Sequence, residues 1–556
     1  SLLPAPCSLP PYTPTSMAFR RVIRSLDGLN RWPSIDPIDV AMRWPSEAPL
    51  LFLGSGRPHP RWSRWSIVAT PARWVVIPQE SSSAAAALES DPLAALQRAL
   101  DSTRLAADHA TPLDVPFAGG WIGLLGYELG RALEPAARSP AGRGDSAKPG
   151  SSANTWPIVA LGWCPHALVH DAATQRWWRV ATACDDAEAV RSDNEFHAED
   201  KAACVRAGAI VDAVAAAMID GPTESHAFPP PCGAPPQLPE FTDVTSPRDW
   251  CEAVSAVVEL IRAGDIFQAN LTRQRRGVVH GSPRKLGLEI LRAASPWHGA
   301  LLELPEGRSV VSLSPELFLM GALATALCAG TDAGQQGDAP RAGGSDRRRW
   351  ILSRPIKGTR AADDDPAELL TSEKDAAELN MIVDLMRNDL GRICEIGSVR
   401  VTESRHLERH PTVHQGVATI EGVPRADIDV AAMLRATFPA GSITGAPKIR
   451  AMQVIEMLEP APRGPYCGSI GFFSDSGEFA LNVAIRTLVF DAPCGGASQV
   501  TYGVGCGIVS DSDPDTEWLE SVQKAAIIDL VRERLADEER SRNSTNHPLS
   551  HPAPAP

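Results

Sequence analysis

Two pairs of acidic residues are spaced so that each pair shares one face of a helix. In SEKDAAELNMIVDL, Asp375 and Glu378 are three positions apart, and in DPDTEWLESVQKA, Glu517 and Glu520 have the same spacing. Residues three or four apart lie on one helical face. Two such helices facing each other could hold a hard divalent cation and leave places for water and a ligand carboxylate. Taken alone, each pair is more commonly a solvated helix face.

The segment RPIKGTR, residues 354–360, carries one lysine between two arginines. Pro355 restricts one backbone dihedral and Gly358 supplies freedom, so the segment is predicted to form a tight turn. So short a segment cannot bury Lys357 by itself. From these residues alone, the amine is either a solvated charge or a group that faces a substrate.

Two glycine-rich stretches could lie against a ligand. FPAGSITGAPKIRAM, residues 438–452, is predicted to be a loop that enters a helix with Pro447 at its first position. Free backbone N–H groups there can bind an anion, although a capped turn is the simpler interpretation. In YGVGCGIV, Gly503, Gly505 and Gly507 leave one strand face bare, which predicts the close approach of a ligand or another backbone.

Two further polar residues stand in apolar surroundings. Arg486, in LNVAIRTL, is predicted to lie in an otherwise apolar strand, where a buried arginine needs an anionic partner from the protein or a ligand. His414, in HPTVHQG, could transfer a proton or make a hydrogen bond, although a lone histidine is more often structural.

The elements that must position these residues indicate an α+β fold. Capping signals and apolar periodicity predict a helix from Ser246 to Gly264. Alternating apolar residues predict strands in segments such as DIFQANLTRQ, and GPYCGSIGFF and LNVAIRTLVF are predicted to be two strands joined at Ser476-Gly477. Strands and helices do not alternate strictly, which favours a large antiparallel sheet. Further helices are expected over about 372–389, 446–458 and 514–535, the last with Asp513 as its cap and Pro514 at its first position.

Composition bounds the organisation and the partners. The 556 residues are 44% hydrophobic and 22% charged, which is typical of a globular protein. A net charge of -14 disfavours nucleic-acid binding, and the eleven cysteines without a C-x-x-C pair favour reduced thiols in the cytoplasm. The apolar runs are too short to span a membrane. We expect the chain to divide into a disordered extension (1–17), an N-terminal region (18–235), a catalytic region (245–530) and a disordered tail (537–556), with linker-like segments at 136–154, 220–240 and 329–348.

Over residues 245–530 the chain strongly resembles the chorismate-utilising enzymes, which include anthranilate, aminodeoxychorismate, isochorismate and salicylate synthases. The resemblance implies two antiparallel sheets packed together with helices outside. The segments that carry it are GDIFQANLTR, SLSPELF, RPIKGTR, EKDAAELNMIVDLMRNDLGRIC, VHQGVATIEG, GSITGAPKIRAMQVIEMLE, YCGSIGFF, NVAIRT and GVGCGIVSDSDPDTEWLESVQKA, with PFAGGWIGLLGYELGR nearer the N-terminus.

The resemblance also implies roles for individual residues. Glu378 and Glu520 would be the principal Mg²⁺ ligands, with Glu517 and Asp375 close by or acting through water. The metal would hold the ring carboxylate of chorismate. The remaining substrate-binding positions are Gly358, Thr359, Ser442, Tyr466, Arg486, Gly505, Gly507 and Lys524, of which Arg486 and Tyr466 would bind the enolpyruvyl side chain. His414 would lie beside the ring, and Glu316 would lie near the C4 hydroxyl.

Lys357 distinguishes between members of this family. Anthranilate synthases usually carry P-I-A-G-T here, whereas aminodeoxychorismate synthases carry P-I-K-G-T, as this chain does. The resemblance implies that Lys357 attacks C2 of chorismate as the C4 hydroxyl leaves, and that ammonia then attacks C4. Glu316 would protonate the leaving hydroxide, which requires burial to raise its pKa. Lys357 must be neutral to attack, which calls for partial desolvation or a nearby cation such as Arg360.

The alternatives and the nitrogen source follow from other positions. Isochorismate and salicylate synthases activate water with a lysine where this chain has Gln268, which cannot act as a base. No cysteine lies in a glutaminase-type elbow, so we expect a separate glutamine amidotransferase subunit to supply ammonia, within 4-aminobenzoate and folate synthesis. Anthranilate synthase component I is the alternative, and a non-catalytic homologue that binds chorismate or tryptophan is a weaker one. APLLFLGSG departs from the usual feedback motif, so regulation by tryptophan stays open.

Overall fold

The computed structural model describes most of the chain. The described residues are 19–26, 35–79 (except 55, 57–58 and 60), 91–103, 115–137, 156–184, 195–220, 237–323, 349–409 (except 362–363) and 413–545. The predicted extension at 1–17, most of the three linker-like segments and residues 546–556 lie outside them.

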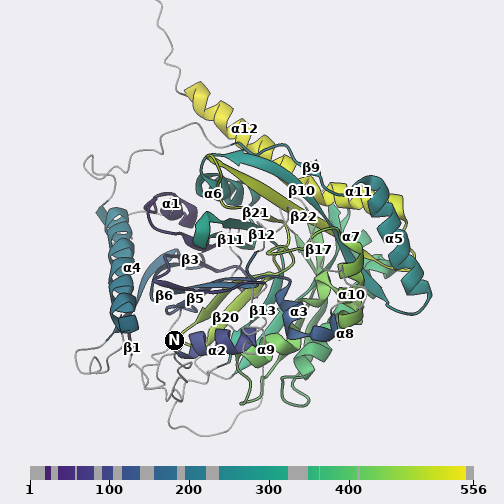
Figure 1. The fold of residues 1–556 in the computed structure, drawn as a ribbon, viewed down its shortest axis with the longest axis horizontal. Helices are drawn as coiled ribbons and strands as arrows, with labels where there is room; N and C mark the ends of the chain where they lie inside the picture. Colours follow the sequence, from purple (N-terminus) through teal and green to yellow (C-terminus); the bar gives the residue numbers. More distant parts are fainter. Residues whose placement is uncertain are drawn as a thin grey trace, which may run out of the picture.

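Two antiparallel sheets form the centre of the molecule (Figure 1). The first has twelve described strands in the order β1 (Phe19–Ser25), β8 (Arg176–Cys184), β7 (His166–Asp171), β3 (Trp65–Ala69), β2 (Leu51–Gly54), β11 (His298–Glu303), β12 (Ser309–Ser314), β21 (Thr487–Phe490), β22 (Ala497–Ile508), β10 (Gln268–His280) and β18 (Gly445–Ala446), with β9 (Thr242–Asp243) on β10.

The second sheet has ten described strands, in the order β15 (Ile356–Ala361), β17 (Val413–Gly422), β14 (Trp350–Arg354), β13 (Leu317–Ala322), β20 (Glu478–Asn482), β19 (Ser469–Ser474), β5 (Gly120–Leu125), β6 (Val159–Cys164) and β4 (Arg73–Ile77), with β16 (Arg400–Arg409) on β17. Both the 18–235 and the 245–530 regions supply strands to both sheets.

Helices lie outside the sheets, as expected (Figure 1). They are α1 (Pro37–Met42), α2 (Pro92–Asp101), α3 (Leu129–Leu133), α4 (Glu195–Asp220), α5 (Pro247–Arg262), α6 (Pro283–Ala294), α7 (Pro366–Thr371), α8 (Glu373–Gly391), α9 (Val430–Thr437), α10 (Lys448–Leu458), α11 (Pro514–Ala525) and α12 (Ile527–Thr545). Short 3-10 turns cover Pro135–Ala137, Pro305–Gly307 and Gly441–Ile443.

Three large apolar clusters account for this layering. One lies between the sheets and joins Leu51 of the first to Ile122 of the second. Another buries the first sheet under α1, α4, α6 and α12, with Val211 and Ile528 as members. The third buries the second sheet under α2, α3, α8 and α9, with Ile382 as a member. Because each sheet is covered on both faces, the predicted α+β class with packed antiparallel sheets is confirmed.

Helices α5 and α11 begin at the caps that the sequence predicts, and α8 begins at a cap that was not predicted. The Ser246 hydroxyl accepts from the Asp249 N–H at the start of α5, and Ser372 accepts from Asp375 N–H at the start of α8. Asp513 caps α11, with Pro514 in its first turn as predicted. The prediction for α10 was one position off, because Pro447 is its N-cap and the helix begins at Lys448.

RPIKGTR is not a turn. Its residues continue from β14 into β15, and both strands pair with β17, with Ser353 opposite Ile420 and Ile356 opposite Val417. The freedom of Gly358 is used for a register shift between Lys357 and Thr359, where its φ is +79°. Pairing with a strand about 60 residues away therefore replaces the predicted local turn.

Two C-terminal predictions also change. LNVAIRTLVF is two strands, β20 and β21, which belong to different sheets. Arg486 lies in the crossing between them with φ of 52°, so it is not inside a strand. The expected helix over 514–535 is divided between α11 and α12, and α12 continues to Thr545, into the segment predicted to be disordered.

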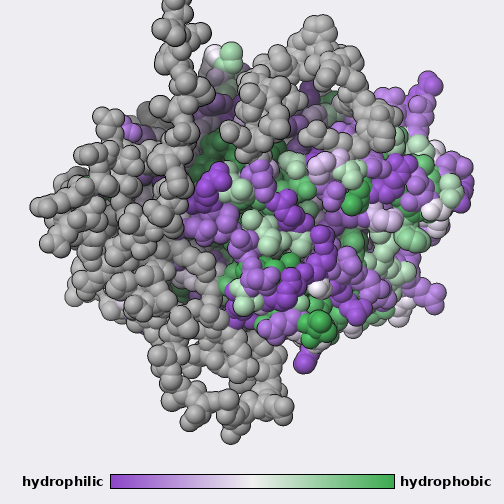
Figure 2. All heavy atoms as spheres, turned by 60° about the horizontal axis from the view of Figure 1, so that its bottom comes forward, coloured by the Kyte–Doolittle hydropathy of each residue, from purple (hydrophilic) through white to green (hydrophobic). Residues whose placement is uncertain are grey.

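The surface is of mixed character. On the face shown in Figure 2, hydrophilic and hydrophobic residues are interspersed wherever the residues are coloured. Among the described residues, no helix combines the length and the apolar composition that a membrane crossing requires.

Candidate active site

Lys357 points inward, toward the bare face of β22. Its Nζ lies 3.1 Å from the position that a Cβ atom on Gly507 would occupy, so the missing side chain makes room for the amine. The amide nitrogen of Gln268, on the neighbouring strand β10, lies 2.5 Å from the same position. Gln268 is fully buried, and neither of its amide atoms has a hydrogen-bond partner within the described part of the chain. The Lys357 amine therefore lies near a buried amide whose hydrogen-bonding atoms are unused.

Three carboxylates interact electrostatically with this amine. Glu316 follows β12, Glu378 lies on α8, and Glu520 lies on α11. We call Lys357 and these three residues the site cluster. Burial raises the pKa of Glu378, and Asp375 and Glu520 raise it further, against the opposing effect of Lys357. Two helices and two sheets therefore bring their charges to one place.

The two carboxylates of α11 have different hydrogen-bond partners. Burial would raise the pKa of Glu520, but the Lys524 ammonium, 2.6 Å from Glu520 Oε1, outweighs it and lowers the pKa. Lys524 also donates to the Gly505 carbonyl at 3.2 Å. One turn earlier, Glu517 is buried and accepts from the Ser512 hydroxyl at 2.6 Å through Oε1.

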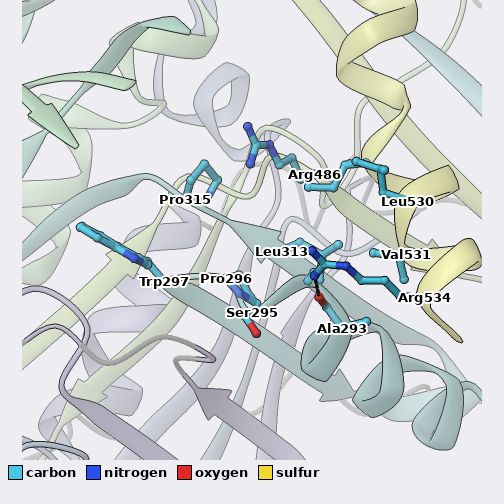
Figure 3. A pocket seen from close by; sticks show the side chains of 12 residues that line it. Ala293, Ser295, Pro296, Trp297, Leu313, Pro315, Arg486, Leu530, Val531 and Arg534 are labelled. Atoms are coloured by element: carbon cyan, nitrogen blue, oxygen red, sulfur yellow. Dashed lines mark hydrogen bonds between the residues drawn. The ribbon is translucent and has the colours of Figure 1, made fainter. Parts of the chain in front are cut away.

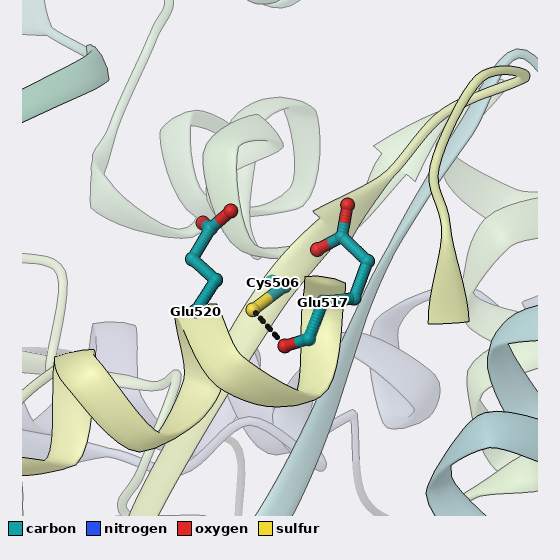
Figure 4. Close-up of side chains that lie close together, drawn as sticks. All are labelled: Cys506, Glu517 and Glu520. Atoms are coloured by element: carbon teal, nitrogen blue, oxygen red, sulfur yellow. Dashed lines mark hydrogen bonds between the residues drawn. The ribbon is translucent and has the colours of Figure 1, made fainter. Parts of the chain in front are cut away.

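The donor set suits a hard divalent cation. The second carboxylate oxygen of Glu517, Oε2, is buried and has no hydrogen-bond partner among the described residues. Cys506 lies beside Glu517 and Glu520 (Figure 4), but burial raises the pKa of its thiol to about 12. The thiol donates to the Glu517 carbonyl instead. Carboxylate oxygens with one unused oxygen atom fit Mg²⁺, whereas a protonated thiol is a poor ligand.

Glu316 has the character of an acid. Burial raises its pKa to about 7, although the Ser442 hydroxyl, Lys357 and Arg486 favour the ionised form. Glu316 is 4% exposed and precedes β13, and Ser442 lies in the buried 3-10 turn before β18. Half of such carboxyl groups are protonated near neutral pH, which permits proton donation.

Arg486 connects the site cluster to a surface pocket. The pocket lies between the end of α6, the β12–β13 connection and α12, and Figure 3 shows Arg486 and Pro315 among the side chains that line it. The Arg486 carbonyl accepts from the Leu313 N–H at 3.0 Å, which helps hold the crossing in place. Burial lowers the pKa of this arginine, and Tyr502 and Glu316 act in the opposite direction.

The glycine-lined face of β22 has more than one neighbour. A Cβ on Gly503 would lie 2.4 Å from the ring of Tyr466, and one on Gly505 would lie 2.5 Å from the Leu271 carbonyl of β10. Gly503 and Gly505 are thus explained by packing against the protein. Gly507 lies against the side chains of Gln268 and Lys357. The close approach of another backbone is thus found at Gly505, and the approach of a ligand stays a prediction.

Other candidate residues lie at the edge of this arrangement. Asp375 pairs with Arg360 at 2.8 Å, which occupies its carboxylate. Gly358 allows α7 and α8 to approach, since a Cβ there would lie 2.6 Å from Leu369 Cδ1. Thr359 is exposed. His414 is buried in β17, opposite Arg360 in the register.

Sequence reasoning missed Lys374. This residue of α8 interacts electrostatically with Glu378 on its own helix and with Glu517 and Glu520 on α11. Its position four residues before Glu378 is a signal that could have found it, because such pairs share a helical face.

A comparison of the sequence with protein families agrees with this geometry. The profile described as chorismate binding enzyme matches residues 57–338 and 345–529. The chain belongs to this family. The matched residues include the acidic helices, the glycine strand and RPIKGTR.

Relatives with two kinds of name are similar to this chain. Aminodeoxychorismate synthase of Streptomyces griseus is 34% identical over 74% of this chain, which spans only half of that protein. Aminodeoxychorismate synthase component 1 of Escherichia coli is 32% identical over 78% of this chain and 81% of its own length. Anthranilate synthase component 1 1 of Haloarcula marismortui is 34% identical, with 80% and 81% coverage. Overall identity therefore does not separate the two activities.

A solved structure has the same fold. Anthranilate synthase component I from Streptococcus pneumoniae superposes with a TM-score of 0.61 at 24% identity, covering 89% of this chain and 97% of that one. The likeness concerns the fold alone. The chain is a chorismate-utilising enzyme, and neither its fold nor its overall identity to relatives distinguishes which reaction it catalyses.

Proposed function

We propose that this chorismate-utilising enzyme is an aminodeoxychorismate synthase, which converts chorismate and ammonia to 4-amino-4-deoxychorismate. The observation that carries the proposal is the position of Lys357. Its amine lies against Gly507 and interacts with Glu316, Glu378 and Glu520. An amine held inside a carboxylate-lined site is placed to act on a bound substrate, whereas a solvated charge would point outward.

In the first step, Lys357 Nζ attacks C2 of chorismate. A C2–N bond forms, the ring double bond shifts, and the C4–O bond breaks. Hydroxide is a poor leaving group, so Glu316 donates a proton and water departs. The pKa of Glu316, raised by burial to about 7, leaves a protonated fraction at neutral pH. Lys357 attacks in its neutral form.

In the second step, ammonia attacks C4 and the double bond shifts back. The C2–N bond to Lys357 breaks, and the amine is regenerated. The Glu316 carboxylate accepts the proton that ammonia loses, which restores the acid for the next turnover. Two displacements place the new amine at C4, and together they replace one difficult substitution by two easier ones.

Other residues orient the substrate and exclude competing reactions. Arg486 and Tyr466 would bind the enolpyruvyl group, and Ser442 would contact a carboxylate. Both Tyr466 and Ser442 are buried, which limits access of water to the ring. The amide of Gln268 lies beside Gly507 near the Lys357 amine. By the resemblance it would replace the lysine that activates water, and an amide cannot act as a base.

The carboxylates of α8 and α11 would hold Mg²⁺. Glu378 and Glu520 are its proposed ligands, and the unused oxygen of Glu517 supports the assignment. When bound, the cation would engage the ring carboxylate of chorismate and withdraw charge from the ring. Lys374 and Lys524 would limit repulsion among the carboxylates when no cation is bound.

The nitrogen source is proposed to be a separate glutamine amidotransferase subunit. None of the eleven cysteines lies in a glutaminase-type elbow. A cytoplasmic location is proposed because the eleven cysteines are scattered and include no C-x-x-C pair, which favours reduced thiols. The product would be a precursor of 4-aminobenzoate and folate.

The test is to incubate the purified chain with chorismate, Mg²⁺ and ammonium and to separate the products by mass spectrometry. We expect 4-amino-4-deoxychorismate, and no product once EDTA removes the metal. Anthranilate would instead support anthranilate synthase, the alternative that the name of the Haloarcula relative suggests. Absence of any product under every condition would favour a non-catalytic homologue.

A further inference from the structure

A second group of charges lies beside the site but takes no part in the proposed chemistry. It consists of Arg463, Glu459 and Glu128, which are 4%, 6% and 5% exposed. We call these residues the anchor cluster. Glu459 follows α10, Arg463 precedes β19, and Glu128 precedes α3 in the N-terminal region.

The guanidinium of Arg463 makes contacts in two directions. Nε donates to Glu459 Oε2 at 2.9 Å and Nη2 donates to Oε1 at 2.6 Å, which is a bidentate pair. On its other edge, Nη1 donates to the Ile443 carbonyl at 2.8 Å and Nη2 donates to the Asn270 carbonyl at 2.6 Å. One planar group therefore joins a carboxylate to two backbone segments.

Those two segments form adjacent walls of the site, and they pair where Gln268 lies opposite Ala446 and Ala269 opposite Gly445. Ile443 directly follows Ser442, whose hydroxyl favours the ionised form of Glu316. Asn270 lies two residues after Gln268 on β10 and is paired with Gly507, the residue that faces the Lys357 amine. The Asn270 N–H also donates to the Thr444 carbonyl at 2.8 Å, so the turn and the strand are already adjacent.

The rest of the anchor cluster holds Arg463 itself in place. The backbone N–H of Arg463 donates to Glu128 Oε1 at 2.9 Å, and that of Gly464 donates to Oε2 at 3.0 Å. The guanidinium carbon lies 4.4 Å from the centre of the Tyr127 ring. Glu459 also accepts from the N–H and hydroxyl of Thr272 on β10. Glu128 of the N-terminal region thereby restrains Arg463, a residue of the 245–530 region.

We propose that Arg463 is a positioning residue, which fixes the Ser442 turn against the Gln268–Asn270 segment and so determines how well chorismate fits beside them. The inference rests on the proposed function for its substrate. A lysine at 463 would keep the charge, but a single ammonium cannot present the planar fork that makes all four hydrogen bonds. A small shift of either wall would displace Ser442 relative to Lys357.

The test compares Arg463→Lys with Arg131→Lys. Arg131 is a matched control because it also neighbours Glu128, at 3.6 Å, but its other partner is Glu456 and it contacts neither wall. Chorismate affinity is measured by titration calorimetry with Mg²⁺, and kcat and KM are measured with ammonium. Hydrogen exchange by mass spectrometry follows residues 441–446 and 268–272 in the absence of substrate.

For Arg463→Lys we expect chorismate affinity to fall by about 10- to 100-fold, because a displacement of about 1 Å can cost that much. KM should rise with it, and exchange should increase in both segments. Arg131→Lys should change none of these. In a Ser442→Ala background, Arg463→Lys should cost less than it does alone, since both act through the same turn.

Unchanged exchange in both segments, or an affinity equal to that of the Arg131→Lys variant, would overturn the inference. So would full additivity with Ser442→Ala, which a merely structural role predicts. If the unsubstituted enzyme failed to bind chorismate, the proposed function would fail, while the exchange comparison would still decide the role of Arg463.

Discussion

The site cluster and the anchor cluster are two groups of charges in one protein, and they differ in how completely their atoms are used. In the anchor cluster, every nitrogen of the Arg463 guanidinium donates to an oxygen. Around the site cluster, Gln268 and Glu517 Oε2 have no partner within the described residues. Buried polar atoms are usually paired, so such unused atoms mark where a ligand is expected.

The same difference separates catalysis from stability. A group that must bind a substrate cannot also be saturated by the protein, whereas a group that holds backbone segments gains from saturation. Substitutions in the site cluster should therefore remove activity without a large loss of stability. Substitutions in the anchor cluster should lower stability as well as affinity.

The largest effect is expected for Lys357→Ala. Loss of the nucleophile should reduce formation of 4-amino-4-deoxychorismate by more than about 1,000-fold, as for other covalent catalysts. Product is quantified by mass spectrometry at saturating chorismate. Lys374→Ala is the control, because Lys374 neighbours the same carboxylates; its loss should be far smaller. Equal rates for the wild type and Lys357→Ala would contradict the nucleophile role.

Glu316→Gln should lower kcat by about 100- to 10,000-fold, the usual contribution of a general acid. In the wild type, the protonated form is the active one, and burial raises the pKa of Glu316 to about 7. The kcat of the wild type should therefore decline as the pH rises through 7. Glutamine does not titrate, so a decline that persists unchanged in the variant would assign the acid to another group.

Arg463→Met tests the anchor cluster by stability. It leaves the Glu459 carboxylate buried without its ion-pair partner, which should lower the free energy of unfolding by about 3–5 kcal/mol. The measurement is urea unfolding followed by circular dichroism. Lys357→Met should lower the free energy much less, because Lys357 is only half buried among carboxylates. Equal losses for the two variants would remove the distinction between the clusters.

Glu316 should also make stability depend on pH. Its pKa in the folded protein is raised to about 7 from a usual value of 4.5, so folding takes up a proton between these values. The stabilisation is complete below about pH 4.5 and is lost as the pH rises through 7. From pH 5 to 8 the wild type should lose about 3 kcal/mol relative to Glu316→Gln. Parallel pH profiles of the two urea midpoints would contradict this.

The smallest effect is expected for Arg131→Met. Arg131 and Glu456 are 20% and 22% exposed, and partly exposed pairs usually contribute about 1 kcal/mol or less. Glu128 keeps its hydrogen bonds from the Arg463 and Gly464 N–H groups when Arg131 is replaced. Unfolding free energy and chorismate KM should both stay near those of the wild type. A large decrease in the unfolding free energy, or a large change in KM, would show that Arg131 acts as part of the anchor cluster.

Local chemistry was predictable where it depends on near neighbours. Ser246 and Asp513 cap their helices as the sequence indicates, because a cap involves atoms only two or three residues away. The carboxylates of α11 share a face for the same reason. Sequence patterning also predicted the fold class, since both helix periodicity and strand alternation persist along the chain.

Predictions failed where a distant partner decides the conformation. RPIKGTR has the composition of a turn, but hydrogen bonds to β17 make it a strand. Arg486 has apolar neighbours in sequence, but the chain changes sheets there, which gives it a left-handed φ. Neither partner is visible in the local pattern.

By itself, the sequence determined which groups are available: an amine in P-I-K-G-T, carboxylates three apart on two helices, and bare glycines on a strand. Only the tertiary structure decided that Lys357 Nζ lies against Gly507 and that Arg463 joins two walls of the site. The physical reason is that residue type and short-range spacing are local properties. The distance between groups 150 residues apart depends on how two sheets pack.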